Sequence, residues 1–101
     1  MQFLVTAYDG IDEKSIERRL TARDEHLALV ESMFNRGIHL YAAAITDDND
    51  KMIGSVLIVD FPSRFELDEW LKVEPYVLGK VWDKIEIKPC KVGGMFLGLH
   101  K

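Results

Sequence analysis

The feature that most constrains the fold is a rigid corner at Glu74-Pro75-Tyr76, which an alternating segment follows almost at once. Proline fixes its own backbone φ angle, and an acidic residue at such a corner accepts backbone N–H bonds. From Trp82 to Lys88 the side chains alternate between two faces, which is typical of a half-exposed strand. We expect this strand to end at Pro89.

The main helix is predicted from Arg23 to Asn35, because apolar residues recur there at helical spacing. Gly37 follows as the residue that accepts a left-handed cap. The segment 12–21 is polar and predicts a short helix or a structured loop. The other expected elements are strands at residues 2–8, 39–46 and 52–61 and a second helix at about 64–72.

The third strand, residues 52–61, is an almost continuous β-branched run, so we expect it to be central and buried on both faces. The order strand–helix–strand–strand–helix–strand predicts an α+β, ferredoxin-like subunit with both helices on one sheet face. The other face would then be uncovered, and a second copy of the sheet would bury it in a dimeric α+β barrel. The residues expected on that uncovered face are Phe3, Val5, Val56 and Ile58.

A chain of 101 residues is one domain, residues 1–101, with its core at about 2–91. The tail, residues 92–101, is too apolar for a disordered end and is expected to pack on something, a second subunit being one candidate. Net charge is -4 and the basic residues are scattered, which argues against nucleic acid or an anionic membrane as partner.

Three further observations favour a cytoplasmic location. The first apolar stretch is interrupted too early for a secretory signal, and no apolar run approaches the ~20 residues that span a bilayer. The lone cysteine, Cys90, excludes an internal disulfide and suits a reducing compartment.

No metal is expected because the histidines lack ligand-like spacing, and no cofactor is expected because no phosphate or dinucleotide fingerprint is present.

His26 is the best candidate for proton transfer, because imidazole titrates near neutrality and a neighbouring carboxylate can orient it. The alternative is a boundary histidine bonded to a backbone carbonyl. Glu74 is the preferred carboxylate partner. Its alternative role is to accept backbone N–H bonds at the corner that Pro75 makes, and both roles can hold together. Asp9 is a second carboxylate, but Asp9-Gly10 is the ordinary composition of a turn, and we favour the turn.

Substrate contacts are predicted at four further residues. Hydroxyl groups from a tyrosine or serine would reach into a pocket, and an arginine would bind a substrate carboxylate or phenolate. The alternative for the arginine is a solvated side chain or one paired with a nearby acid. Trp70 and Phe65 are instead expected in the core. The predicted substrate-binding residues are Tyr76, Ser55, Arg23 and Tyr41.

Several short motifs follow one another from about Phe3 to Lys91: Arg23-x-x-His26-Leu27, Gly54-Ser55, Phe61, Trp70, Glu74-Pro75-Tyr76-Val77 and the strand 81–91 with Lys88-Pro89. Their order and spacing resemble the YciI-like (YCII-related) family. The resemblance implies a dimeric α+β barrel with a pocket between sheet and helices. It also implies that His26 matches an active-site histidine paired with a carboxylate. One branch is similar to dehydrochlorinases of hydroxylated chloroaromatics, and related barrels include lactone isomerases and small monooxygenases.

The chain departs from the family pattern at three places. Ala43-Ala44 stands where a glycine and a proline often follow the second strand, which alters the expected rim of the pocket. Glu74 replaces an aspartate, so its carboxylate reaches one methylene further. Cys90 replaces an aromatic residue after the Lys-Pro stop.

The leading hypothesis is a small cofactor-independent homodimeric enzyme that performs elimination, such as dehydrochlorination, or isomerisation on a small cyclic or aromatic acid-like molecule. His26 would be the general acid or base and Glu74 would orient it. The alternative is a non-catalytic ligand-binding or regulatory barrel, with a subunit of a larger complex as a third hypothesis.

Overall fold

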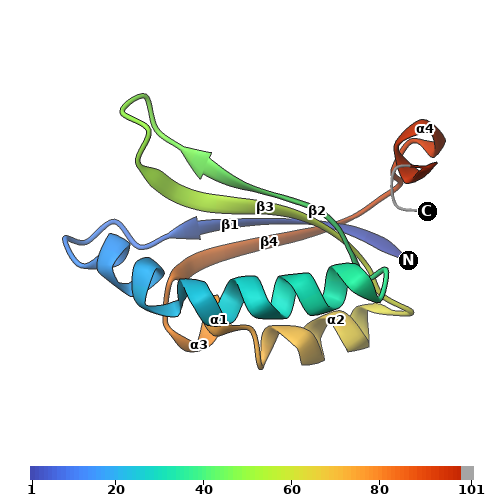
Figure 1. Cartoon of the computed structure of the whole chain (residues 1–101), viewed down its shortest axis with the longest axis horizontal. Coiled ribbons are helices and arrows are strands. Elements are labelled where there is room, and N and C mark those ends of the chain that lie inside the picture. The colour runs from blue at the N-terminus through green and yellow to red at the C-terminus, as the bar shows by residue number, and fades with distance from the viewer. Residues whose placement is uncertain (99–101) are drawn as a thin grey trace.

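The computed structural model describes residues 1–98 of the chain (Figure 1). Its strands form one four-stranded antiparallel sheet in the order β2-β3-β1-β4, and this is the predicted α+β, ferredoxin-like arrangement. The elements are β1 (Gln2–Asp9), α1 (Ser15–Asn35), β2 (His39–Thr46), β3 (Met52–Asp60), α2 (Arg64–Leu71), α3 (Pro75–Leu78), β4 (Trp82–Cys90) and α4 (Gly94–Leu97).

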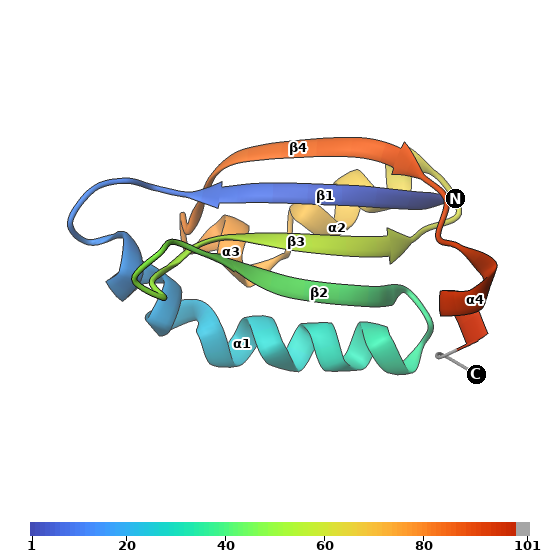
Figure 2. The ribbon, with the colours of Figure 1, turned by 90° about the horizontal axis from the view of Figure 1, so that it is seen from above.

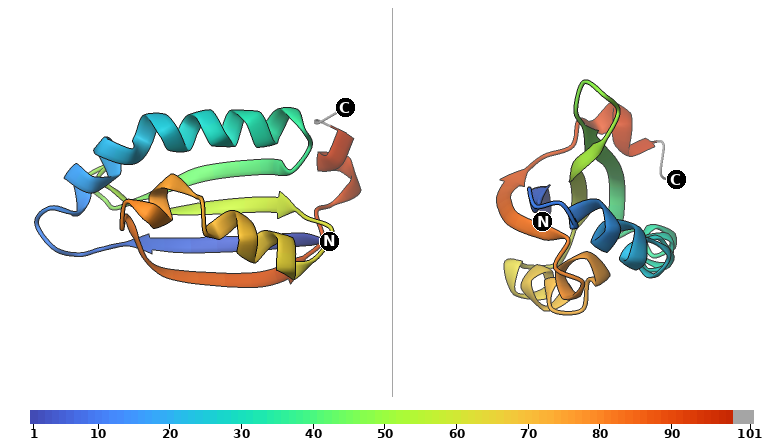
Figure 3. Two further views of the ribbon diagram at one scale, coloured as in Figure 1. Left: turned by 90° about the horizontal axis from the view of Figure 1, so that it is seen from below. Right: turned by 90° about the vertical axis from the view of Figure 1, so that its left-hand side faces the viewer.

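Helices α1, α2 and α3 lie on the same face of the sheet, and α4 lies beyond one end of it (Figures 2 and 3). The core fills the space between the sheet and these three helices. Apolar burial there supplies most of the stabilisation of the domain. Its main members are Phe3, Val5, Leu57 and Val59 from the sheet and Met33, Leu67, Trp70 and Tyr76 from the helices.

The prediction for the uncovered sheet face was wrong for Phe3 and Val5, which are 2% and 0% exposed beneath the helices. The reason is the register: Val5 pairs with Leu57, and paired residues share one face of the sheet. Ile58 pairs with Leu4 on the opposite face, and both are only partly buried. β3 is therefore central, as predicted, but fully buried on one face only.

Helix α1 begins at Ser15 rather than near Arg23. Its first two turns are too polar to show a helical stripe, and a buried ion pair with the sheet holds them instead. Arg19 binds Asp9 of β1, whereas Arg18 binds Asp12 at the surface, six residues away in the chain. The predicted short segment and the predicted main helix are therefore one continuous helix.

Two smaller differences concern the second half of the chain. Phe65 is 67% exposed, because α2 turns Leu67 and Trp70 toward the core instead. β4 continues through Pro89 to Cys90, which an edge strand permits because its outer side needs no ladder hydrogen bond. The segment after β4 is attached to β1, since the Val92 N–H donates to the Gln2 side chain at 2.6 Å.

The described part of the apolar tail is not buried within the subunit: Met95 and Phe96 are 83% and 58% exposed. Phe96 of α4, together with Tyr41 and Ile58 of the sheet, lines a groove of about 320 Å³. The remainder of the predicted tail, residues 99–101, lies outside the described residues. No helix within residues 1–98 has the length and apolar character needed to cross a membrane.

Candidate active site

The centre of the site is a buried pair formed by His26 of α1 and Glu74. His26 Nδ1 lies 2.6 Å from Glu74 Oε1, and the two side chains are 9% and 0% exposed. A carboxylate can only accept, so the shared proton belongs to Nδ1 when Glu74 is ionised. Within residues 1–98, no hydrogen bond engages Nε2 of His26. Nε2 is therefore the ring nitrogen that is left to bond with a bound molecule.

Glu74 holds this position because it also caps α3. Its Oε1 accepts from the backbone N–H of Tyr76 at 3.0 Å, and Pro75 occupies the first helical position. Proline there fits the helix because its missing N–H would have no intrahelical partner. The predicted corner is thus a one-turn helix, and the same carboxylate oxygen serves both the corner and His26.

Two aromatic rings fix the plane of the imidazole. The Tyr76 ring stacks on His26 with centroids 3.7 Å apart and an interplanar angle of 7°. Trp82 meets it edge-on at 5.9 Å. Burial raises the pKa of the Tyr76 phenol, so Tyr76 stays neutral at physiological pH. The ring of His26 is held from one side by an uncharged aromatic wall.

A second buried pair lies next to the dyad. Both oxygens of Asp9 accept from Arg19 Nη1, at 2.9 and 3.0 Å, and both residues are almost fully buried. The preferred interpretation of Asp9 as a plain turn residue was therefore wrong. Arg19 was not predicted, although it lies two helical turns before His26 and so on the same face of α1. That spacing was the signal available in the sequence.

Ser55 is held as a hydrogen-bond donor toward its surroundings. Its Oγ accepts from Arg19 Nη2 at 3.1 Å and from the Trp82 indole N–H at 3.2 Å. Because both lone pairs are occupied, the hydroxyl proton remains to be donated. The preceding residue, Gly54, lets the backbone of β3 lie close to β1, since a Cβ on Gly54 would be 2.5 Å from the Ala7 carbonyl oxygen.

These groups surround a cavity of about 230 Å³ between α1 and the sheet. The structure brings His26, Tyr76, Ser55 and Arg23 together on its walls, with Glu74 behind His26. Tyr41 does not join them, because it lies on the other side of β2 and is 64% exposed. The remaining lining residues are Arg19, Leu27, Val30, Ala42, Ala43, Ala44, Met52 and Leu57.

His39 of β2 is a second buried histidine that sequence reasoning did not single out. It is 2% exposed, and its ring meets Trp70 edge-on at 5.8 Å. Burial lowers its pKa to about 4, although Glu74 raises it and His26 lowers it further to a smaller extent. His39 is therefore neutral in the folded protein near pH 7. Among the described residues, no three His, Cys, Asp or Glu side chains converge as a metal site.

We expect the buried His39 to make the fold sensitive to acid. Its pKa falls from 6.5 when unfolded to about 4 when folded, so the unfolded chain binds the extra proton first. Stability should be lost as pH falls from about 6.5 to about 4, by up to about 3 kcal/mol. Urea unfolding at pH 7, 5.5 and 4 checks this. In His39→Leu the loss over this window should shrink by the same amount; an identical loss in both proteins would contradict the assignment.

The fold and the dyad define a ferredoxin-like α+β protein with a buried histidine–carboxylate pair beside a small cavity. Residues 1–91 match the YCII-related domain, and the chain belongs to that family, which confirms the resemblance. Protein YciI of Escherichia coli O6:H1 and that of Shigella flexneri are each 32% identical over 97 residues, covering 90% of this chain and 97% of the relative. An uncharacterized protein of Haemophilus influenzae is 29% identical over the same length.

Among solved structures, the chain is similar to 5-chloro-2-hydroxyhydroquinone dehydrochlorinase (TftG) from Burkholderia phenoliruptrix AC1100 in complex with 2,5-dihydroxybenzoquinone. The TM-score is 0.77 with 24% identity, covering 94% of this chain and 98% of that one. The two proteins share a fold over nearly their whole lengths.

Proposed function

We propose that the chain is a cofactor-independent enzyme in which His26 performs acid–base chemistry on a small molecule and Glu74 orients it. The observation that carries this proposal is the 2.6 Å contact between Nδ1 and Oε1, because it leaves Nε2 for the substrate. A buried, ring-stacked imidazole with a fixed tautomer suits a general base that must later return its proton.

In the proposed reaction, Nε2 of His26 takes a proton from a substrate O–H or C–H group. The electron pair of that bond moves through the substrate, and a leaving group such as chloride departs with its own bonding pair. The net loss is then HCl. In an isomerisation, Nε2 instead returns the proton to another carbon. Glu74 lowers the energy of the imidazolium formed in between, because its negative charge is in direct contact.

The other cavity residues favour a cyclic, acid-like substrate. Asp9 already neutralises Arg19, so Arg23 is the cation that would bind a substrate carboxylate or phenolate. Ser55 would donate its hydroxyl proton to a substrate oxygen, and Tyr76 would flank the ring. A volume of about 230 Å³ suits a single ring. The name of the dehydrochlorinase neighbour makes hydroxylated, chlorinated rings the first compounds to try, and its ligand adds hydroxylated quinones.

The test is whether the protein turns over hydroxylated chloroaromatic compounds and small cyclic acids. Chloride release and NMR spectra of the product measure the turnover. We expect His26→Ala to lower the rate of an active compound by about 10²- to 10⁴-fold. Glu69→Gln is the control, because this carboxylate is exposed on α2 and pairs with Lys72. A pH–rate profile that His26→Ala leaves unchanged would remove the mechanism. Binding of such compounds without any turnover would favour the non-catalytic barrel.

We also propose that the enzyme is a homodimer whose subunits cover each other's open sheet face. Leu4, Val56 and Ile58 lie there only partly buried, and one helical layer cannot cover both faces of the sheet. Sedimentation at micromolar concentration should give about twice the chain mass. Val56→Lys should shift the protein to monomer by placing a charge in the interface; a purely monomeric wild type would exclude the dimer.

A further inference from the structure

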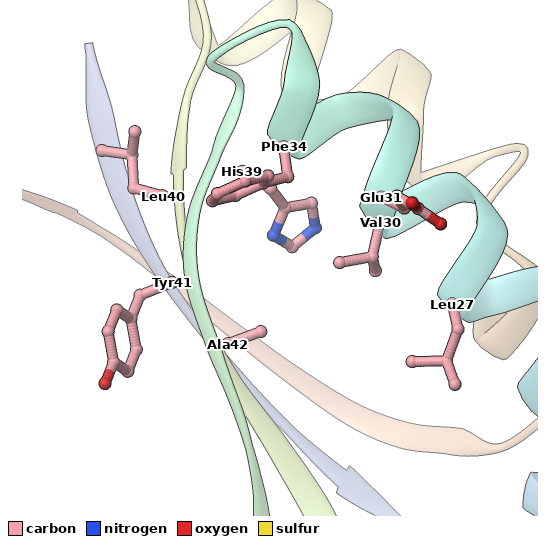
Figure 4. Close-up of a pocket in the computed structure, with 8 residues that line it drawn as sticks. All are labelled: Leu27, Val30, Glu31, Phe34, His39, Leu40, Tyr41 and Ala42. Carbon is pink, nitrogen blue, oxygen red and sulfur yellow. The ribbon is translucent and has the colours of Figure 1, made fainter. Parts of the chain in front are cut away.

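A second, more apolar groove continues from the His26 cavity along α1 and β2. Its volume is about 400 Å³, and it shares Leu27, Val30 and Ala42 with the His26 cavity. Figure 4 shows Val30 on α1 and Ala42 on β2 directed into the space between them, whereas Tyr41 points to the other side of β2. The two spaces therefore form one elongated depression. The groove is bordered by Leu27, Val30, Glu31, Phe34, His39, Leu40 and Ala42, and by Tyr41, whose ring points away from it.

His39 is the polar feature of this groove that the fold itself does not explain. Its ring lies between β2 and α1, and neither ring nitrogen has a hydrogen-bond partner within residues 1–98 (Figure 4). A neutral imidazole carries one N–H donor and one acceptor nitrogen. Leaving such buried groups unpaired costs about 1–3 kcal/mol each, so an unpaired histidine on a cavity wall points to a ligand.

The surroundings of His39 indicate what kind of ligand group it would accept. The groove side chains are mostly apolar, and the ring stays uncharged near pH 7, so an ionic group would lose its hydration without gaining a counter-charge. A hydroxyl group, by contrast, can both donate and accept. The cationic side chain of Arg23 lies in the other cavity, where an acidic group of the same molecule would bind.

We propose that this groove binds an uncharged apolar arm of the substrate, and that a hydroxyl group on that arm hydrogen-bonds to His39. The substrate would then span both spaces, with its reacting ring at His26 and its arm between α1 and β2. The assignment of the reacting end rests on the function proposed above. The binding of the arm does not.

The probes are 4-propylphenol and propylbenzene, which share an apolar frame and differ by one hydroxyl group. In the wild-type protein, we expect 4-propylphenol to shift the ¹⁵N signals of the His39 ring and to give NOEs to the Val30 and Ala42 methyl groups. Propylbenzene should give the NOEs without the ring shifts. If the phenol leaves the His39 nitrogens unchanged, His39 is a structural residue and the proposal fails, whatever any variant does.

Two variants separate the hydroxyl contact from the groove. His39→Leu should lower the affinity for 4-propylphenol about 3- to 10-fold without lowering the affinity for propylbenzene, because one hydrogen bond is lost. Ala42→Leu should weaken both probes, since the larger side chain enters the groove where it joins the His26 cavity. Equal weakening of both probes in His39→Leu would contradict the proposal. Loss of probe binding when the dimer forms would also contradict the proposal, because it would show that a second copy of the chain covers the groove.

His26→Ala distinguishes this proposal from the function. The phenol should still shift the His39 nitrogens in that variant, because His26 is not part of the groove. Probe binding at His39 without turnover of any compound would support the groove proposal and contradict the proposed catalytic function. Turnover that depends on His26, together with no probe contact at His39, would support the catalytic function and contradict the groove proposal.

Discussion

Replacing Asp9 by alanine is expected to lower the free energy of unfolding by about 3–5 kcal/mol. The substitution leaves the Arg19 guanidinium, whose side chain is 4% exposed, without its counter-charge inside the protein. Because α1 begins with turns that carry no apolar stripe, the loss should also loosen the start of that helix. Arg19 Cζ lies 5.0 Å from the centre of the Tyr76 ring, so the disturbance should reach the wall of the candidate active site.

Chemical unfolding of Asp9→Ala, Arg19→Met and the double variant measures this pair directly. The double variant should lose less than the sum of the single variants, since it removes both buried charges together. Asp12→Ala is the control: both oxygens of Asp12 accept from Arg18, one from Nη1 and one from Nη2, but at the surface, where solvent screens the pair and little stability is lost. Additive losses in the Asp9 and Arg19 variants would show that the two charges are not coupled.

Replacing Glu74 by alanine is expected to lower the free energy of unfolding by about 2–4 kcal/mol and to abolish turnover. The carboxylate is 0% exposed and accepts from both Tyr76 N–H and His26 Nδ1. Its loss removes the cap of α3 and leaves two buried donors unpaired. The imidazole would then be free to rotate away from the Tyr76 ring.

Glu74→Gln separates the two effects. The amide oxygen can still accept both hydrogen bonds, and only the NH2 group that replaces the buried Oε2, unpartnered among the described residues, is unfavourable, so we expect a loss of only about 1 kcal/mol. A neutral amide cannot stabilise an imidazolium, so the rate should still fall by about 10²-fold or more. Unfolding curves and turnover of the same preparations give both quantities. A stable Glu74→Gln variant with wild-type turnover would reduce Glu74 to a structural cap and remove it from the proposed mechanism.

The sequence predicted the secondary structure well where the local pattern is strong. The β-branched run at 52–61 and the alternation after Trp82 both became strands, and Gly37 has the positive φ of 76° that a helix end requires. The start of α1 was missed because its support is tertiary: Arg19 holds it through a buried ion pair with Asp9 of β1 rather than through an apolar stripe. Propensity gives no sign of such pairs.

The faces of the sheet show the same limit. The alternation of side chains along a strand showed that neighbouring residues point to opposite faces of the sheet, but not which face would pack against the helices. Register decided that Phe3 and Val5 are buried and that Tyr41 lies away from the cavity. His39 was overlooked because nothing in its local sequence signals burial without a hydrogen-bond partner.

By itself, the sequence determined the order of the main strands and helices, the family, and the residue types on which the proposal rests, because short-range periodicity and the order and spacing of motifs carry that information. Only the tertiary structure decided that His26 and Glu74, 48 positions apart, come within 2.6 Å. It also decided that Asp9 meets Arg19 rather than completing a turn, and that a groove beside His39 continues the cavity. Such contacts depend on sheet register and helix placement, which all the chain's packing interactions set together.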